Sequence, residues 1–152
     1  MKYIICDIDG VLADCSHRLH YIEKVPKDWD GFFEACSEDK EIKDITDPLY
    51  YMNFSIDEFG SDYTEMILVT GRPERIRNKT IEWMEDSKWL KAMSGNLILM
   101  RKDGDHRKDY IVKLELVKDY GINPEDILVV IDDSPAVIEA WIKLGVKTLQ
   151  VR

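Results

Sequence analysis

Short runs of apolar residues alternate along this chain with longer stretches in which apolar residues recur at helical spacing. The runs cover Tyr3–Cys6, Met66–Val69, Leu97–Met100, Ile127–Ile131 and Lys147–Val151. They are continuous rather than alternating, which is typical of strands that are buried on both faces of a parallel sheet. The pattern therefore predicts an α/β fold with a doubly wound parallel sheet and crossover helices.

Three stretches predict helices between the later strands, namely residues 73–86, 107–121 and 134–145. Their start and stop signals are Pro73, Ser134, Pro135, Gly121 and Gly145. The residues predicted to share one helix face are Ile76, Thr80, Trp83 and Met84 in the first stretch, and Tyr110, Leu114, Val117 and Tyr120 in the second. Strands alternating with such helices predict a Rossmann-like sheet.

Residues 14–62 break this alternation, because acidic clusters and scattered aromatic residues replace the expected strand and helix pattern. We predict a small, mostly helical insertion here, between the first and second core strands. Residues 47–60 should close it as a helix that packs back on the sheet. The whole chain, residues 1–152, fits a single domain of ordinary size.

Composition narrows the class of protein. With 45% apolar and 34% charged residues, the chain resembles a soluble globule, and no run approaches the roughly 18 apolar residues of a membrane span. A secretory signal is absent, so we expect a cytoplasmic protein. The cysteines Cys6, Cys15 and Cys36 form no CxxC pair and predict free thiols. A net charge of −9 argues against a protein that coats nucleic acid by general electrostatic attraction, but it does not exclude one that grips the end of a strand.

Polar residues follow the predicted strands where each one ends. They are Asp7, Asp9 and Gly10 after the first strand, Thr70, Gly71 and Arg72 after the second, and Asp132 and Asp133 after the fourth, with Asp109 and Lys113 on the intervening helix. Ligands of open parallel sheets bind at this edge. Four carboxylates at one edge repel one another unless a hard dication such as Mg²⁺ is present. Thr70, the Gly71 backbone and Lys113 are donors suited to phosphate oxygens, so the set predicts phosphoryl chemistry.

The motifs DIDGV, VTGR, a downstream helical lysine and VVIDDS, in this order, resemble those of the haloacid dehalogenase (HAD) superfamily of phosphotransferases. The resemblance covers nearly the whole chain and places residues 14–62 where that superfamily has its cap. It implies that Asp7 attacks phosphorus to form an aspartyl-phosphate, and that Asp9 acts as general acid and base. Thr70 would hydrogen-bond the phosphoryl group, and Lys113 would offset its developing charge.

The same resemblance implies a magnesium site. Its ligands would be Asp7, the backbone carbonyl of Asp9, and an acid of the last motif, either Asp132 or Asp133. The metal would keep the charge of the nucleophile from repelling the incoming phosphate. Gly10 would let the backbone turn so that the Asp9 side chain reaches the same phosphate.

A narrower resemblance concerns the substrate. RKDYIVKLEL followed by VIDDSPAVIEAWIKLGV is similar to the 3′-phosphatase domain of phage polynucleotide kinase-phosphatases. It implies that Arg18, Arg72, Asp109 and Lys113 support catalysis on a phosphomonoester at a nucleic-acid 3′ end. The chain departs from that family in having Val11 where Thr is usual, and IDDSP where IDDR is usual. It has no GxxxxGK[ST], so we expect no kinase half in this chain.

Alternative hypotheses are a nucleotidase acting on free mononucleotides, and a phospho-accepting or binding module without turnover. No sequence feature indicates an oligomeric state.

Two basic groups border the predicted site and suit a long anionic substrate or solvated helix faces: Arg72, Arg75, Arg77 and Lys79, and Arg101, Lys102, Arg107 and Lys108. His17 and His20 are expected to be surface or cap residues, with His17 at the substrate entrance. Trp29, Phe32 and Phe33 could stack bases, although aromatic residues at this spacing more often form a core.

Overall fold

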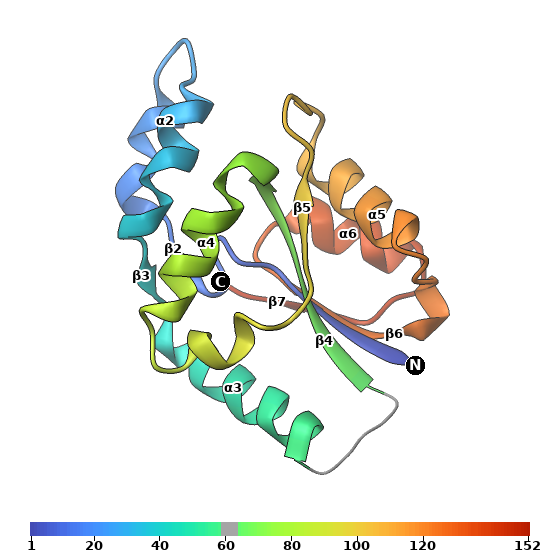
Figure 1. Cartoon of the computed structure of the whole chain (residues 1–152). Coiled ribbons are helices and arrows are strands. Elements are labelled where there is room, and N and C mark those ends of the chain that lie inside the picture. The colour runs from blue at the N-terminus through green and yellow to red at the C-terminus, as the bar shows by residue number, and fades with distance from the viewer. Residues whose placement is uncertain (59–63) are drawn as a thin grey trace.

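The computed structural model describes residues 1–58 and 64–152, which fold around a five-stranded parallel sheet with the order β5-β4-β1-β6-β7 (Figure 1). The strands are β1 (Lys2–Cys6), β4 (Thr64–Pro73), β5 (Ile98–Arg101), β6 (Ile127–Asp132) and β7 (Thr148–Gln150). The chain proceeds outward from β1 to β5, then crosses to β6 on the other side. The strand order therefore reverses at β1, as in a doubly wound sheet, and the predicted fold class is confirmed.

The register of β1 with its two neighbours sets the level of the strand ends. Cys6 is paired with Leu68 on β4 and with Ile131 on β6. The Asp7 amide donates a further hydrogen bond to the Ile131 carbonyl (2.9 Å). As a result, Asp7 and Asp132 leave their strands side by side.

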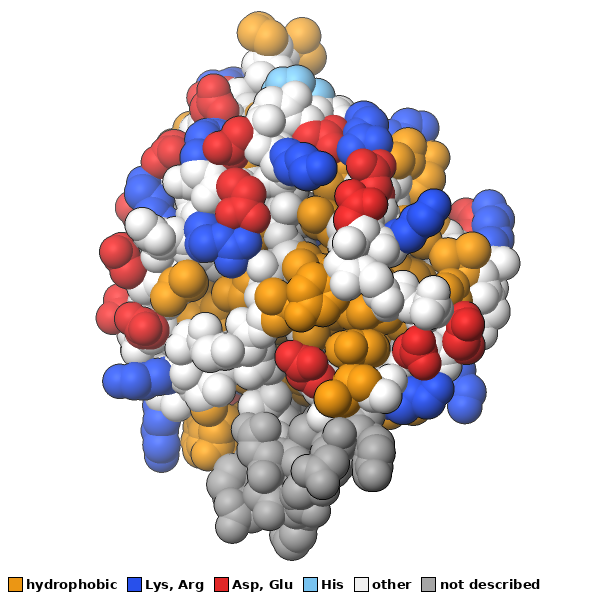
Figure 2. Space-filling model, turned by 45° about the vertical axis from the view of Figure 1, so that its right-hand side comes forward, with side chains coloured by type: hydrophobic (Ala, Val, Ile, Leu, Met, Phe, Trp, Pro, Cys, Tyr) orange, Lys and Arg blue, Asp and Glu red, His pale blue; other side chains and the backbone are white. Residues whose placement is uncertain are grey.

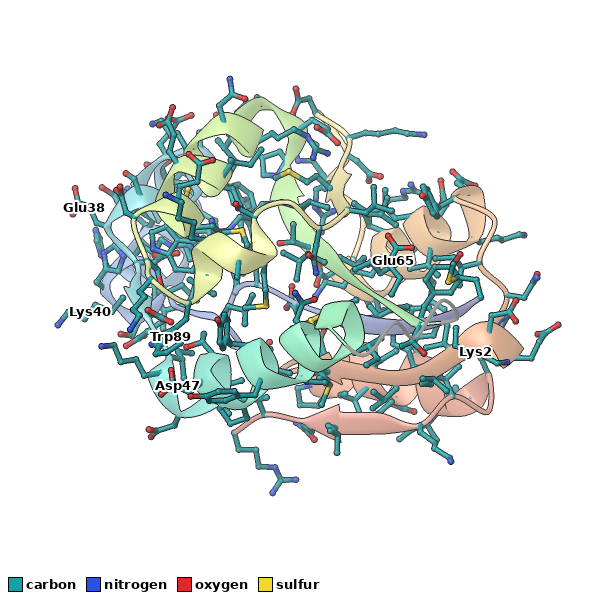
Figure 3. The ribbon with its side chains drawn as sticks, turned by 60° about the horizontal axis from the view of Figure 1, so that its bottom comes forward. Lys2, Glu38, Lys40, Asp47, Glu65 and Trp89 are labelled. Carbon is teal, nitrogen blue, oxygen red and sulfur yellow. The ribbon has the colours of Figure 1, made fainter. Side chains whose placement is uncertain are left out.

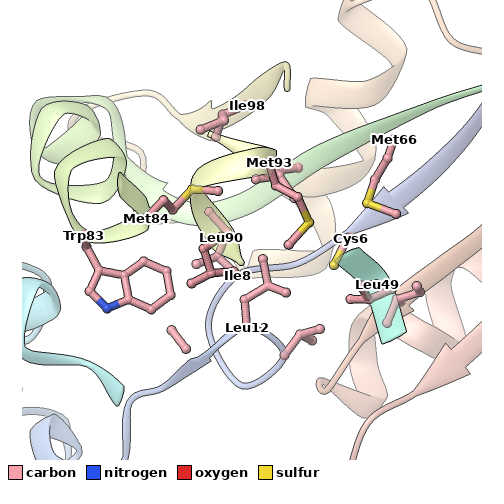
Figure 4. Close-up of a cluster of buried hydrophobic side chains, with 14 of the residues drawn as sticks. Cys6, Ile8, Leu12, Leu49, Met66, Trp83, Met84, Leu90, Met93 and Ile98 are labelled. Carbon is pink, nitrogen blue, oxygen red and sulfur yellow. The ribbon is translucent and has the colours of Figure 1, made fainter. Parts of the chain in front are cut away.

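Helices cover both faces of the sheet because alternate strand residues point to opposite sides. On one face, α5 (Asp109–Asp119) and α6 (Pro135–Lys143) bury residues such as Val117 and Trp141 against Ile5. On the other, α4 (Arg77–Glu85) and the 3-10 turn η4 (Leu90–Met93) pack against β1, β4 and β5 (Figure 4). The remaining 3-10 turns of the core are η3 (Glu74–Ile76) and η5 (Pro124–Asp126). Among the described residues, no helix is long and apolar enough to cross a membrane.

The segment between β1 and β4 contains short helices and one long helix. Its elements are β2 (Ala13–Asp14), η1 (Ser16–Arg18), α1 (His20–Glu23), α2 (Trp29–Glu34), η2 (Ala35–Glu38), β3 (Lys40–Glu41) and α3 (Lys43–Glu58). The short strands β2 and β3 pair antiparallel. Helix α3 begins four residues before the predicted start, and Leu49 on it packs with Cys6 and Met66 of the sheet (Figure 4). Residues 59 and 60 of the predicted helix lie outside the described residues.

Three local predictions are wrong. Strand β4 continues through Thr70, Gly71 and Arg72 to Pro73, so Pro73 ends a strand rather than opening a helix. A register shift relative to β5 accommodates this continuation. Tyr120, which was predicted to share a helix face with Leu114 and Val117, lies just beyond the end of α5 and is half exposed.

Candidate active site

The site lies at the carboxyl ends of β1, β4 and β6, the upper end of the sheet in Figure 1, where the segment with α2 adjoins it. The sequence-predicted residues fall into two groups there. One surrounds Asp7 and contains Asp109, Lys113, Asp132 and Asp133. The other surrounds Asp9 and contains Arg18 and Arg72. The predicted residues are thus brought together, but the two carboxylates of DID have different surroundings.

In the first group, one buried lysine faces three carboxylates. The Nζ of Lys113 lies 2.8 Å from Asp7 Oδ2, 2.8 Å from Asp132 Oδ2 and 3.0 Å from Asp109 Oδ2. Burial acts to lower the pKa of Lys113, but the carboxylates outweigh it and raise that pKa well above its usual range. Burial raises the pKa of Asp7 well above its usual range too, because Asp132 and Asp109 add to it and Lys113 offsets only part.

The carboxylates around Asp7 fit a metal ion. Ligand atoms of Asp7, Asp132 and Asp133 lie within 4.8 Å of one another. The buried Oδ1 of Asp7 has no hydrogen-bond partner among the described residues, and such an orphaned oxygen is costly unless a cation or donor meets it. Burial and the charge of Asp132 raise the pKa of Asp133. An oxygen-only, electron-rich cluster of this kind suits Mg²⁺.

In the second group, two buried arginines hold Asp9. The Oδ1 of Asp9 accepts hydrogen bonds from Arg72 Nη2 (2.6 Å), Arg72 Nε (2.9 Å) and Arg18 Nη2 (2.8 Å). Burial opposes ionisation of Asp9, but the charges of Arg72 and Arg18 outweigh it and hold the pKa of Asp9 below its usual range. Both arginine side chains are fully buried. They contact the carboxylate of Asp9 instead of opening toward solvent.

Asp39, which sequence reasoning missed, completes this second group. Its Oδ2 accepts from Arg18 Nη2 and Arg72 Nη2, both at 2.7 Å, and its Oδ1 accepts from Arg18 Nε at 2.7 Å. His17 Nε2 also lies 2.8 Å from Asp39 Oδ1. Trp83 Nε1 donates to the Asp39 carbonyl (2.7 Å). Asp39 therefore joins the inserted segment to the core, and it gives the two arginines a second buried counter-charge.

Gly10 and Gly71 provide close backbone approaches at the site. Gly10 has a φ of +80°, and a Cβ there would lie 2.1 Å from Asp133 Oδ2. A Cβ on Gly71 would lie 2.3 Å from Asp109 Oδ1. The Gly71 carbonyl accepts from Arg101 Nε (2.9 Å), and Arg101 Nη2 donates to Asp109 (2.8 Å). Any side chain at either glycine would therefore displace a carboxylate of the first group.

Thr70 is completely buried on β4, and its Oγ1 accepts a hydrogen bond from the Arg72 amide (3.2 Å). No acceptor for the Thr70 hydroxyl proton is found in the part of the chain that the structure describes, so this proton can be donated to a ligand. Thr70 therefore keeps the donor capacity that the sequence predicts for it.

The basic groups near the site are mostly neutralised. Arg75 pairs with Asp30, Arg77 with Glu74, Lys79 with Glu34, Arg101 with Asp109, and Arg107 with Asp105 and Glu115. Figure 2 shows acidic and basic side chains interleaved over one face rather than gathered by sign. These arginines and lysines are therefore better described as paired surface residues than as a basic track. His20 Nδ1 lies 3.0 Å from the His17 carbonyl, and neither histidine joins the carboxylate cluster.

The fold is that of known HAD-type phosphatases. A HAD-family enzyme of Bacteroides thetaiotaomicron, solved in complex with magnesium and inorganic phosphate, matches 99% of this chain and 93% of its own length, with a TM-score of 0.52 and 14% identity. A polypeptide of the Pnkp1/Rnl/Hen1 complex matches 99% of this chain and 45% of its own length, with a TM-score of 0.72 and 25% identity. The chain therefore has the fold of the HAD-type hydrolases.

Within that class, residues 1–152 match the family of polynucleotide kinase PNKP phosphatase domains. The chain belongs to this family. A protein of Autographa californica nuclear polyhedrosis virus, whose name describes a bifunctional polynucleotide kinase/RNA ligase, is 25% identical over 148 residues. That match covers 97% of this chain and 19% of the viral protein. The chain thus spans about a fifth of this relative, and less than half of the polypeptide in the solved complex.

Proposed function

We propose that this protein is a Mg²⁺-dependent phosphomonoesterase that removes 3′-phosphates from nucleic-acid ends through an aspartyl-phosphate. One observation carries the proposal: a buried oxygen of Asp7, which has no hydrogen-bond partner in residues 1–58 and 64–152, lies among carboxylates, beside an Asp9 that two arginines hold in place. The two acids of the DID motif are thereby set up for different tasks. Membership of the polynucleotide kinase phosphatase family supports the choice of substrate.

Asp7, Asp132 and Asp133 would hold the magnesium ion. When bound, the ion would neutralise the cluster, keep Asp7 ionised and lower its repulsion of a phosphate dianion. The Asp9 side chain, which is engaged by arginines, would remain outside that carboxylate cluster. This assignment leaves Lys113 to bridge Asp7 and Asp132 and to offset charge on the transferring phosphoryl group.

In the first half-reaction, an oxygen of Asp7 forms a bond to phosphorus while the bond to the 3′ oxygen breaks. Asp9 gives its proton to that leaving oxygen. The arginines favour the anion of Asp9 in the free protein, so the bound phosphate dianion must raise the pKa of Asp9 for this step. In the second half-reaction, Asp9 takes a proton from water, the water oxygen bonds to phosphorus, and Asp7 is released with inorganic phosphate.

The remaining predicted residues would position these groups. Thr70 would donate its hydroxyl proton to a phosphoryl oxygen. Arg18 and Arg72, predicted as phosphate-binding, would act mainly by orienting Asp9, because both are fully buried on it. Asp109 would orient Lys113, with which it pairs at 3.0 Å. Residues 14–62 would serve as the cap and supply Arg18 and Asp39.

The test is a substrate panel in Mg²⁺. Phosphate release is measured from one oligonucleotide carrying a 3′-phosphate, the same oligonucleotide carrying a 5′-phosphate, and a set of free mononucleotides. We expect the 3′-phosphorylated end to have the highest kcat/KM. A preference for mononucleotides would make the protein a nucleotidase and overturn the proposed substrate. Asp7→Asn protein, prepared in parallel, controls for contaminating phosphatases.

A further inference from the structure

We propose that Trp29 is a stacking platform for the terminal base of a single-stranded, 3′-phosphorylated substrate. The inference rests on the proposed function, and it adds a residue that selects for a base next to the phosphate. Trp29 is the first residue of α2, in the inserted segment (Figure 1).

Trp29 is held by other aromatic rings, yet much of its own surface is exposed. Its ring lies 5.8 Å from that of Phe32, edge to face, and 6.0 Å from that of Phe33, nearly parallel. Trp29 is nevertheless 43% exposed, whereas Trp83 and Trp141 are 7% and 2% exposed. Neighbouring rings thus fix the indole in orientation while part of its surface remains free. A preoriented aromatic surface is what a base needs for stacking, since little side-chain entropy is lost.

Two chains of contacts connect Trp29 to the site. Phe32 lies under the Arg18 guanidinium, with Cζ 4.2 Å from the ring centroid, and Arg18 in turn hydrogen-bonds Asp9. Phe33 faces the guanidinium of Arg75. Arg75 lies three residues after Arg72, just beyond the end of β4. The platform therefore lies within a few side chains of the carboxylate that would protonate the 3′ oxygen.

The charge beside the ring also suits a nucleic-acid end. Lys27 Nζ lies 5.5 Å from the Trp29 ring centroid, and Lys27 is exposed. Within residues 1–58 and 64–152, Lys27 has no ion-pair partner, unlike Lys24, Arg75 and Lys79 nearby. Lys27 is thus a free cation that can meet a backbone phosphate next to the stacked base. Because every base has a π face, this platform would accept ends of any sequence.

The experiment compares substrates with and without a terminal base. Steady-state constants are measured for a 3′-phosphorylated oligonucleotide, for the same oligonucleotide with an abasic terminal nucleotide, and for p-nitrophenyl phosphate. The variants are Trp29→Ala, Trp29→Phe and, as a matched control, Tyr51→Ala. Tyr51 is an exposed aromatic residue on α3, and its ring lies 6.3 Å from that of Trp89, which is labelled in Figure 3.

For Trp29→Ala we expect KM for the normal oligonucleotide to rise roughly tenfold, the effect of losing one stacked base. Activity on p-nitrophenyl phosphate should not change, because that substrate carries no nucleobase. Trp29→Phe should retain most of the affinity, and Tyr51→Ala all of it. The abasic oligonucleotide should already have the raised KM with the unmodified protein, and Trp29→Ala should add no further loss.

An equal loss on all three substrates would overturn the proposal, since Trp29 would then only support the fold. Normal and abasic ends turned over equally well would overturn it too. Either result leaves the proposed function standing. If the unmodified protein hydrolyses p-nitrophenyl phosphate but no oligonucleotide, the proposed function itself fails, and the stacking proposal fails with it.

Binding gives a readout independent of turnover. In Asp7→Asn protein, which should bind substrate without hydrolysing it, the fluorescence of exposed Trp29 should be quenched by the 3′-phosphorylated oligonucleotide. The quenching should disappear when Trp29→Phe is added to Asp7→Asn. Quenching that persists in the double variant would come from another tryptophan and would contradict the proposal.

Discussion

Asp7 and Asp9 are separated by one residue, yet Asp7 Oδ2 meets a single lysine at 2.8 Å whereas Asp9 Oδ1 meets two arginines, the nearer at 2.6 Å. Around Asp7, the carboxylates of Asp109, Asp132 and Asp133 exceed the positive charge. Around Asp9, the two arginines balance Asp9 and Asp39. The group around Asp7 therefore has an excess of negative charge that a cation would neutralise. The charges in the group around Asp9 are already balanced.

Removing the charge of Asp7 should separate activity from stability. Asp7→Asn should lower phosphatase activity by roughly 10³-fold or more, because no carboxylate remains to attack phosphorus. In metal-free buffer the same variant should melt at a higher temperature than the unmodified protein, because carboxylate repulsion is relieved. Phosphate release and thermal melting in EDTA measure the two effects. A variant that retains substantial activity would refute Asp7 as the nucleophile.

Mg²⁺ should stabilise the fold as well as support turnover. At about 100 times its dissociation constant, a ligand of the native state alone adds roughly 2.7 kcal/mol. We expect EDTA to abolish activity, and added Mg²⁺ to raise the melting temperature in a concentration-dependent way. Asp133→Asn should shift this response to higher Mg²⁺, whereas Asp119→Asn on α5, outside the carboxylate cluster, should not. Identical titrations for both variants would exclude Asp133 as a ligand.

Asp39 should matter far more to stability than a surface acid does. Asp39→Asn leaves Arg18 and Arg72 with Asp9, which is partly exposed, as their carboxylate partner among the described residues, and breaking a buried ion pair costs about 3–5 kcal/mol. Glu34→Gln removes a partner of exposed Lys79 and should cost under ~1 kcal/mol. Urea unfolding of the two variants measures the difference. Similar losses in both would mean that the buried cluster contributes no more than a surface pair.

Gly10 should tolerate substitution less well than a glycine of the same backbone conformation elsewhere. Gly10 and Gly104 have φ values of +80° and +76°, but a Cβ at Gly104 meets nothing within 4 Å. Gly104→Ala should therefore cost about 1–2 kcal/mol from backbone strain alone. Gly10→Ala should cost more and should weaken the Mg²⁺ response, since Asp133 must move. Equal unfolding free energies and equal Mg²⁺ responses would contradict the observed contact.

The thiols should be unreactive in the native protein. Burial, followed by the charge of Asp9, raises the pKa of Cys15 to about 11, and burial raises the pKa of Cys6 and Cys36 as well. Because the thiolate is the nucleophile, native protein at pH 8 should react with iodoacetamide far more slowly than urea-unfolded protein. Mass spectrometry of alkylated protein follows the reaction. Rapid native modification of Cys15 would show that its thiol is less shielded than the structure indicates.

The sequence predicted those features that the local pattern of apolar and polar residues determines. Buried strands have continuous apolar runs, so their positions and the acids that follow them could be inferred, and the register then brings Asp7 level with Asp132. Strand β4 was underestimated because Gly71 and Pro73 are residues that strands usually lack. Pairing with β5, which resumes at Pro73 and Arg101 after a register shift, outweighs that local preference.

Asp39 could not be found in this way. It lies in the acidic stretch SEDKE, which looks like a solvated surface. Its partners Arg18 and Arg72 are 21 and 33 residues away, so only the tertiary fold brings them together. The sequence placed both arginines near phosphate because a resemblance implied it. In the structure both arginines contact the carboxylates of Asp9 and Asp39. No regular spacing in the sequence indicates these pairings.

The buried contacts of Asp39 also bear on how a substrate enters. The carboxylate of Asp39, in the insertion, accepts hydrogen bonds from Arg18 of the same segment and from Arg72 of the core. The backbone carbonyl of Asp39 accepts a further hydrogen bond from Trp83 of the core. A lid that swings about a hinge would have to break those buried ion pairs at every turnover. We therefore expect the part of the insertion that carries Asp39 to stay in place during turnover, so that a substrate would enter from the side of the site. Such an entrance would suit the end of a long polymer, which an enclosing chamber could not admit.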